Sequence, residues 1–177
     1  MRRERKPRKI AHILSQEGAA VPFISKIEAR AYARATEIFE RVSKAVLHIF
    51  PEDIRSNVSM TTSSAEGQAG DSIFIITGLL EGEERCEAVF NFILREMGIE
   101  SKRALKRSIE LRLDEGCVFF LRIDKQTAYL GEVKLTDRAD VISVRFHFRD
   151  YPRCRRNDVL QMIESRLQPA EESKYES

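Results

Sequence analysis

The sequence predicts a single α+β domain, built on an antiparallel or mixed β-sheet of about four to five strands with helices packed on one face. Two segments, 23–34 and 141–149, alternate between apolar and polar residues with a period of two, as half-buried strands do. Between them, apolar residues recur at helical spacing, and the expected helices separate strand pairs that resemble hairpins. Hairpin-like pairs interrupted by helices are typical of α+β folds.

The charge of the chain is concentrated at its ends. The 177 residues have a net charge of +2 and are 42% hydrophobic, which suits one domain with one core. Six Lys or Arg and one Glu occupy 1–9, whereas three Glu and one Lys occupy 169–177, so 23 basic and 24 acidic residues remain in 10–168. We therefore expect a basic arm over 1–22, the α+β domain over 23–168 and an acidic tail after it. The arm is either a solvated tail or an extension that seeks phosphates, and the two roles are compatible.

The first strand and helix follow the arm. One face of the strand is mostly small and apolar, and consists of Phe23, Ser25, Ile27, Ala29, Ala31 and Ala33. The other face is mostly charged, and consists of Ile24, Lys26, Glu28, Arg30, Tyr32 and Arg34. Thr36 is expected to cap the helix, with Glu37 in the first turn, where a carboxylate is favoured by the helix dipole. Pro51 ends the helix.

A strand pair and two helices are expected next. Val58 and Met60 indicate a short strand, the turn-forming residues of 63–72 a loop, and the apolar run of 73–80 a well-buried strand.

The first of these two helices, over 82–97, has an acidic outer face that would repel nucleic acid, and Gly98 is its expected C-terminal cap. The second, over about 102–112, is expected to begin at the cap residue Ser101. Its basic outer face consists of Lys102, Arg103, Lys106 and Arg107.

The C-terminal part is expected to form a strand, a short helix, a second alternating strand and a last helix, over 117–124, 125–132, 141–149 and about 158–167. Gly131 ends the short helix. The charged face of the second alternating strand consists of Val141, Ser143, Arg145, His147 and Arg149.

The sequence carries no signal for catalysis, for a cofactor or for a metal. Its three cysteines are isolated and odd in number, so neither a disulfide framework nor a zinc site is predicted, in keeping with a reducing cytoplasm. Its three histidines are scattered, and no phosphate-binding, nucleophile or metalloprotease motif is present. No signal peptide or membrane-spanning run is found. We therefore expect a non-enzymatic protein without cofactor or metal.

Several basic clusters favour nucleic-acid binding, because phosphates are neutralised by Lys and Arg gathered on one surface. They are the arm, the basic helix face, a group after the last strand, and the strand faces that bear Lys26, Arg30, Arg34, Arg145 and Arg149. Tyr32 and His147 on these faces could stack on bases. If the two alternating strands are neighbours, the faces form one basic platform. The alternative is that each cluster is a solvated face, salt-bridged to residues such as Glu28 and Glu110.

One run of residues carries a family resemblance. Residues 121–135, LRIDKQTAYLGEVKL, follow an apolar strand with the pattern Arg-x-Asp-Lys-Gln-x-Ala-Tyr-Leu-Gly. Together with ARAYARATE (29–37), Pro51 and DVISVRFHF (140–148), this run resembles an archaeal family of RNA-binding proteins. The fold of that family is similar to the large-subunit ribosomal protein that binds five-S RNA. The family has also been labelled a predicted exosome-associated subunit.

The resemblance implies an antiparallel sheet packed by helices, a homodimer, affinity for double-stranded RNA and no catalytic centre. It also implies that Lys125 and Gln126, with Arg122 just before them, contact RNA. Alternatively, Gln126 and Gly131 simply build the turn and the short helix.

We therefore expect a protein that recognises structured or double-stranded RNA through backbone charge and shape, in RNA processing or ribosome-related work. The alternative function is a protein-interaction subunit of an exosome-like, RNA-processing complex whose RNA contact is secondary. The near-neutral domain and the acidic helix face favour this alternative.

Overall fold

The computed structural model describes residues 21–67, 70–150 and 152–167, so the predicted tail and nearly all of the predicted arm lie outside the described residues. The five strands are β1 (Phe23–Ala33), β2 (Ser59–Glu66), β3 (Ser72–Glu81), β4 (Val118–Asp124) and β5 (Val141–Arg149). The five α-helices are α1 (Phe39–His48), α2 (Glu83–Glu96), α3 (Ile99–Ser108), α4 (Lys125–Tyr129) and α5 (Arg156–Leu167). Short 3-10 helices lie at Arg55–Asn57 and Ile109–Arg112.

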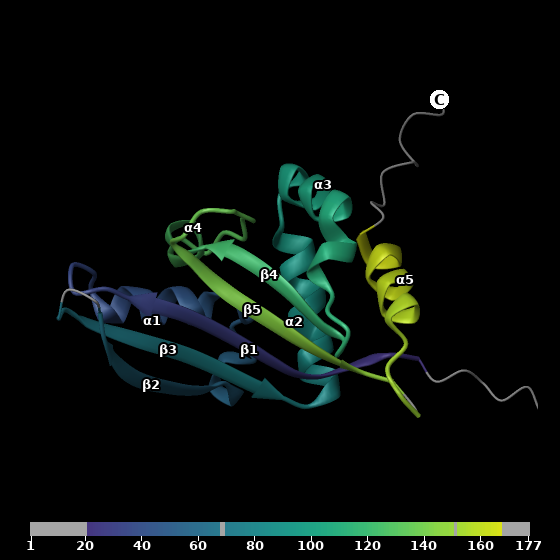
Figure 1. Ribbon diagram of the computed structural model, residues 1–177, viewed down its shortest axis with the longest axis horizontal. Helices are drawn as coiled ribbons and strands as arrows, with labels where there is room; N and C mark the ends of the chain where they lie inside the picture. Colours follow the sequence, from purple (N-terminus) through teal and green to yellow (C-terminus); the bar gives the residue numbers. More distant parts are fainter. Residues whose placement is uncertain (1–20, 68–69, 151, 168–177) are drawn as a thin grey trace, which may run out of the picture.

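The strands form one sheet in the order β2-β3-β1-β5-β4, and every neighbouring pair is antiparallel. Helices α1 and α2 lie against β1 and β3 on a single face of this sheet, behind it in the view of Figure 1. Helix α5 packs against α2 and α3. The α+β class and the antiparallel sheet with helices on one face are thus confirmed.

The core lies between the sheet and the helices. The inward-facing residues of β5, from Ile142 to Phe148, are fully or almost fully buried, as the alternation of the sequence predicts. Phe90 of α2 lies edge-on to Phe119, Phe146 and Phe148, with ring centroids 5.0 to 6.3 Å apart. Edge-to-face pairs of this kind stabilise by about 0.5–1.5 kcal/mol each beyond the area that they bury. This aromatic cluster fixes α2 against the centre of the sheet.

The prediction for Ile24 is wrong. The alternation of 23–34 puts Ile24 on the charged face, whereas the side chain is fully buried in the core. The register between β1 and β5 shifts between Ile24 and Lys26, which marks a bulge. A bulge inserts one extra residue and reverses the side to which the preceding side chains point. The alternation is regular only from Lys26 onward.

Two predicted helix caps are also wrong. Helix α1 begins after Ile38, and Thr36 precedes it in a turn. Glu37 closes this turn, because its carboxylate accepts a hydrogen bond from the Arg34 amide at 3.0 Å. Ser101 lies inside α3, where its buried hydroxyl accepts a hydrogen bond from the Leu135 amide at 3.1 Å.

The two glycines that the sequence predicted to end helices differ in role. Gly98 precedes α3 with a φ of −66°, so it is the N-cap of α3 rather than a left-handed cap of α2. Gly131 follows α4 with a φ of 85°, a backbone conformation that favours glycine, and the predicted end of the short helix is confirmed.

Strand β2 is longer than predicted. Residues 63–66, assigned to a loop because they are small and polar, continue the strand and pair with β3 up to Glu66 opposite Ser72. The strand lies at the edge of the sheet and most of its side chains are exposed. Its sequence therefore lacks the apolar alternation from which strands are predicted.

Cys117 and Cys154 form a disulfide, which the isolated cysteines of the sequence did not predict. Their Cα atoms are 6.3 Å apart. Because β4 and β5 are antiparallel, Cys117 at the start of β4 lies beside the end of β5, and Cys154 follows that end closely. The remaining thiol, Cys86, is buried, and burial raises its pKa to about 11.

No helix within 21–67, 70–150 and 152–167 combines the length and the apolar character needed to cross a membrane.

We expect the variant Cys154→Ser to be less stable by about 2–4 kcal/mol, because a disulfide that closes a loop of 37 residues restricts the unfolded chain. Chemical denaturation with and without a reducing agent measures the loss. Reduction should lower the stability of the unchanged protein to that of the variant and leave the variant as it was. Equal stability of the oxidised protein and the variant would contradict the expectation.

Candidate nucleic-acid interface

One face of the sheet has no helix over it in the described part of the chain. Strands β1 and β5 are neighbours, and Lys26 lies opposite His147, Glu28 opposite Arg145 and Arg30 opposite Ser143. The charged sides of the two alternating strands therefore form one surface, which was the condition for a single basic platform. Strand β4 extends this surface. We call it the open sheet face, and it consists of Lys26, Glu28, Arg30, Tyr32, Phe120, Arg122, Arg145, His147 and Arg149.

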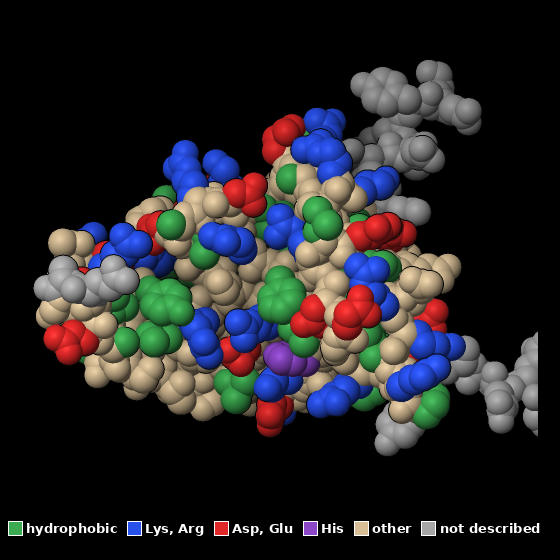
Figure 2. Space-filling view, in the orientation of Figure 1, with side chains coloured by type: hydrophobic (Ala, Val, Ile, Leu, Met, Phe, Trp, Pro, Cys, Tyr) green, Lys and Arg blue, Asp and Glu red, His purple; other side chains and the backbone are tan. Residues whose placement is uncertain are grey.

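Among the described residues, a carboxylate pairs with cations only at the centre of the open sheet face. Glu28 forms ion pairs with Arg30 at 3.0 Å and with Arg145 at 4.0 Å. Among the described residues, no carboxylate lies within ion-pair distance of Lys26, Arg122 or Arg149. The face therefore has a paired centre, and cations without an acidic partner surround it. Figure 2 shows this side of the molecule, with Lys and Arg side chains gathered around a histidine.

Two polar atoms on the open sheet face are buried and have no hydrogen-bond partner among the described residues. They are Nε of Arg30 and Nε2 of His147. Burial of the imidazole, with Lys26 acting in the same direction, lowers the pKa of His147 below its ordinary value of 6.5. The ring is therefore neutral at pH 7.

Aromatic and apolar side chains lie between the cations. The guanidinium of Arg145 is 5.7 Å from the ring centroid of Phe120, and Tyr32 is half exposed near the end of β1. Tyr32 was expected here from the sequence, whereas Phe120 was not. The available signal for Phe120 was its position in the strand of 117–124, between the buried residues Phe119 and Leu121.

The predicted basic residues of α3 face away from the core. Arg103, Lys106 and Arg107 are exposed and Lys102 is half-buried, while Leu105 is fully buried on the opposite side. Arg103 forms an exposed ion pair with Glu100 at 3.1 Å. Lys and Arg side chains over α3 are visible from the same side as the open sheet face (Figure 2).

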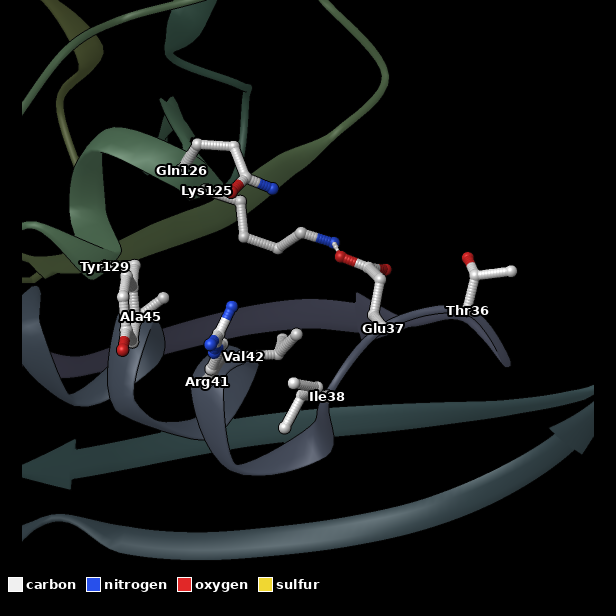
Figure 3. A pocket seen from close by; sticks show the side chains of 9 residues that line it. All are labelled: Thr36, Glu37, Ile38, Arg41, Val42, Ala45, Lys125, Gln126 and Tyr129. Carbon is white, nitrogen blue, oxygen red and sulfur yellow. Dashed lines mark ion pairs between the residues drawn. The ribbon is translucent and has the colours of Figure 1, made fainter.

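The structure gives Lys125 a different role from the predicted RNA contact. The side chain is only 4% exposed, because its ammonium lies 2.6 Å from the Glu37 carboxylate, 2.5 Å from that of Asp140 and 2.9 Å from the Tyr32 carbonyl (Figure 3). A phosphate has no access to an ammonium held in this way. Lys125 instead joins the end of β1, the start of α1 and the segment before β5.

Asp140 is the more exposed partner in this cluster. Burial alone would raise the pKa of its carboxyl, but hydrogen bonds from Lys125 and Gln126 outweigh this effect and hold the pKa below its usual value of 3.8. Gln126 is exposed and donates from Nε2 to Asp140 at 3.2 Å. Arg34 is exposed just beyond β1. Of the predicted contacts around Lys125, Gln126 and Arg34 are therefore accessible.

A cavity of about 240 Å³ lies between α1 and α4, next to the Lys125 ion pairs. Arg41 and Lys44 of α1 approach the ring of Tyr129 from α4, at 5.9 Å and 5.4 Å from its centroid. None of these three residues was expected at a site from the sequence. Arg41 and Lys44 are three apart on one helix and so share a side, but only the tertiary fold brings them to Tyr129.

In the described residues, no group of three or more His, Cys, Asp or Glu side chains is placed to hold a metal ion. What these surfaces offer is positive charge, aromatic rings and amide groups. That combination suits a polyanion with exposed bases.

Comparisons with known proteins point to the same ligand class. A family model described as RNA binding matches residues 26–148. The RNA-binding protein PAB1135 of Pyrococcus abyssi is 32% identical over 127 residues, which make up 71% of this chain and 82% of that protein.

Two solved structures are similar in fold. Protein AF2318 from Archaeoglobus fulgidus is 29% identical with a TM-score of 0.69, over 81% of this chain and 99% of that one. Mth689 from Methanothermobacter thermautotrophicus is 25% identical with a TM-score of 0.67, over 82% and 99% respectively. Because the family model matches well over half of the sequence, the chain belongs to this RNA-binding family.

We expect Lys125→Met to destabilise the protein by about 2–3 kcal/mol, because the change leaves Glu37 and Asp140 without their cation while most of the apolar volume remains. Both carboxylates are partly exposed, so the loss is smaller than for a fully buried pair. Urea denaturation at pH 7 measures it.

The stability of Lys125→Met can also be compared with that of the unchanged protein as a function of pH. A carboxyl whose folded pKa is depressed adds stability above its unfolded pKa, near 3.8 for Asp140, and this contribution disappears as the pH falls through the lower folded pKa. The gap between the unchanged protein and Lys125→Met should therefore narrow below about pH 4. A gap independent of pH would mean that the ion pair contributes nothing.

Proposed function

We propose that the protein binds structured, double-stranded RNA through the open sheet face and acts by binding, without catalysing a reaction. The observation that carries this proposal is the uncovered sheet face on which Lys26, Arg122 and Arg149 have no acidic partner among the described residues. Membership of the RNA-binding family supports RNA as the ligand.

The shape of the open sheet face favours a helical RNA. Lys26 and Arg30 are four residues apart along β1, a span of about 13 Å, and Arg122 lies two strands away, at about 10 Å. The cations are therefore spread over a broad, shallow surface. An A-form duplex has a wide, shallow minor groove bordered by phosphates, whereas its major groove is too narrow for side chains to enter. Recognition by backbone charge and shape follows, with little dependence on sequence.

Helix α3 would supply a second group of contacts. Arg103, Lys106 and Arg107 are exposed on it, and Figure 2 shows Lys and Arg side chains over α3 on the same side as the open sheet face. A duplex longer than the sheet could reach both groups. Binding would then depend steeply on salt, because each neutralised phosphate releases counterions.

A second candidate function is favoured by the acidic side of α2. Glu83 and Glu84 are exposed on it, and Glu87 pairs with Arg166 of α5. This side would repel RNA and suits a protein partner, as in an accessory subunit of an RNA-processing complex or a homodimer. Co-purification of a protein partner that survives nuclease treatment would support it.

A pair of matched variants tests the RNA-binding face. Arg145→Ala with Arg149→Ala removes two exposed cations from the open sheet face, and Arg85→Ala with Arg95→Ala removes two from α2. We expect the slope of log affinity against log salt for an RNA duplex to fall by about two in the first variant and to stay unchanged in the second. Fluorescence anisotropy over a series of salt concentrations measures both slopes.

The control works because both variants change the net charge equally. Glu28 keeps its pair with Arg30 in the sheet variant, so the fold should be retained. Equal slopes in the two variants would show that only the total charge matters and that the open sheet face is not the binding surface. Failure of the unchanged protein to bind duplex RNA at low salt would overturn the proposal altogether.

The neutral His147 gives a pH prediction. Nearby phosphates favour the charged imidazole, so bound RNA should raise a pKa that is depressed in the free protein. Affinity should therefore increase as the pH falls through the raised pKa of the complex and level off below the pKa of the free protein. The total gain is about tenfold for each unit by which RNA raises the pKa of His147. Binding measured at constant ionic strength from pH 8 to about pH 5.5 tests this, and His147→Gln should abolish the dependence. An unchanged dependence in that variant would exclude His147 as its source.

A further inference from the structure

The cavity between α1 and α4 has an apolar floor and a polar rim. Ile38, just before α1, and Val42 of α1 form the floor, and the Tyr129 ring of α4 forms one wall (Figure 3). Ile38 is 52% exposed, so its side chain is accessible to a ligand in the cavity. A volume of about 240 Å³ is enough for one flat heterocyclic ring system.

Arg41 lines the rim, Lys44 lies beside the Tyr129 wall, and both cations lack acidic partners among the described residues. In the described residues, no carboxylate lies within ion-pair distance of Arg41 or Lys44, and both side chains are exposed. Their charged groups instead lie 5.9 Å and 5.4 Å from the Tyr129 ring centroid. A cation beside an aromatic ring, above an apolar floor, matches a ligand that joins a phosphate to a flat ring.

Hydrogen-bonding groups complete the rim. The exposed amide of Gln126 donates to Asp140, and no hydrogen bond to its carbonyl oxygen is found among the described residues. The Glu37 carboxylate is held in place by Lys125 and remains partly exposed. An amide and a carboxylate fixed in this way can accept hydrogen bonds from the edge of a base.

The cavity lies next to the open sheet face along the chain. Lys125 bonds both to the backbone of Tyr32, whose side chain belongs to the open sheet face, and to Glu37 at the cavity. Exposed Arg34 lies between these two residues. A strand of RNA that leaves the open sheet face at the end of β1 would therefore pass Arg34 and reach the cavity.

We propose that this cavity binds one unpaired nucleotide of the RNA, with its base against Tyr129 and Ile38 and its phosphate on Arg41 and Lys44. This inference rests on the proposed function, because it takes RNA as the ligand. It adds a specificity that the open sheet face lacks. The preferred RNA is a duplex that ends in, or is interrupted by, an unpaired nucleotide, since unpaired bases are free to stack on aromatic side chains.

The test compares three RNAs of one sequence: a blunt duplex of about 16 base pairs, and the same duplex with a 3′ or a 5′ overhang of about four nucleotides. Fluorescence anisotropy at fixed salt gives the dissociation constants. We expect one of the two overhangs to tighten binding about tenfold, the scale of stacking one base on an aromatic ring. Tyr129→Ala should remove this gain and leave the affinity for the blunt duplex unchanged.

Further variants separate a nucleotide contact from an effect on the fold. Arg41→Ala with Lys44→Ala alters only exposed side chains and should also remove the gain, whereas Tyr129→Phe should keep it because the ring remains. The matched control is Phe92→Ala on α2, where Arg95 lies 5.6 Å from the ring centroid away from the cavity. This control should keep the full gain. Thermal unfolding of each variant verifies that it is folded.

The outcomes distinguish this inference from the proposed function. Tight binding of the blunt duplex with no gain from either overhang would overturn the nucleotide site and leave duplex binding intact. A gain that persists in both cavity variants would overturn it as well, because the overhang would then bind elsewhere. No binding of the blunt duplex, together with Tyr129-dependent binding of an overhang duplex, would overturn the proposed function and support the cavity.

Discussion

The pairing of β1 with β5 at the centre of the sheet is the constraint on which the rest of the molecule depends. Both strands alternate, so a shift of their register by one residue would expose Val144 and Phe146 and bury Arg145 and His147. The burial of the apolar set therefore fixes the position of the charged set. On its other edge β5 pairs with β4, and this pairing aligns the start of β4 with the end of β5 and brings Cys117 and Cys154 together. The core and the open sheet face are two consequences of one register.

A buried ammonium ties the functional surfaces to this sheet. An unpaired charge in the interior costs several kcal/mol. The fold must therefore place carboxylates within ion-pair distance of the Lys125 ammonium. Glu37 is held at the start of α1 and Asp140 before β5, on either side of the carbonyl of Tyr32. This requirement sets how closely α4 approaches α1, and so shapes the cavity between them. Lys125, which the sequence suggested as an RNA contact, instead holds the end of β1, the start of α1 and the segment before β5 together.

Sequence periodicity predicted the faces of strands and helices, which depend on neighbours along the chain. It failed for features that depend on contacts between residues far apart in the sequence. The faces of β5 followed directly from its unbroken alternation, and the basic side of α3 followed from helical spacing around Leu105. Ile24 was misplaced, because no residue near it signals the bulge that turns it inward. Lys125 was identified but misinterpreted, since its burial depends on Glu37 and Asp140, which are near it only in the folded chain. The disulfide and the cavity escaped prediction for the same reason.

The arrangement of charge on the open sheet face has its own energetic logic. Like charges on neighbouring strands repel one another, so a face that carried only cations would weaken the sheet. Glu28 lies between Arg30 and Arg145 and neutralises the centre, where the side chains are least hydrated. The cations farther out, such as Arg149, are exposed and are screened by water and salt. Repulsion between cations is therefore relieved by Glu28 at the centre, where it would be strongest, and is weakened by solvent farther out. The strands can keep several cations available for a polyanion at little cost in stability.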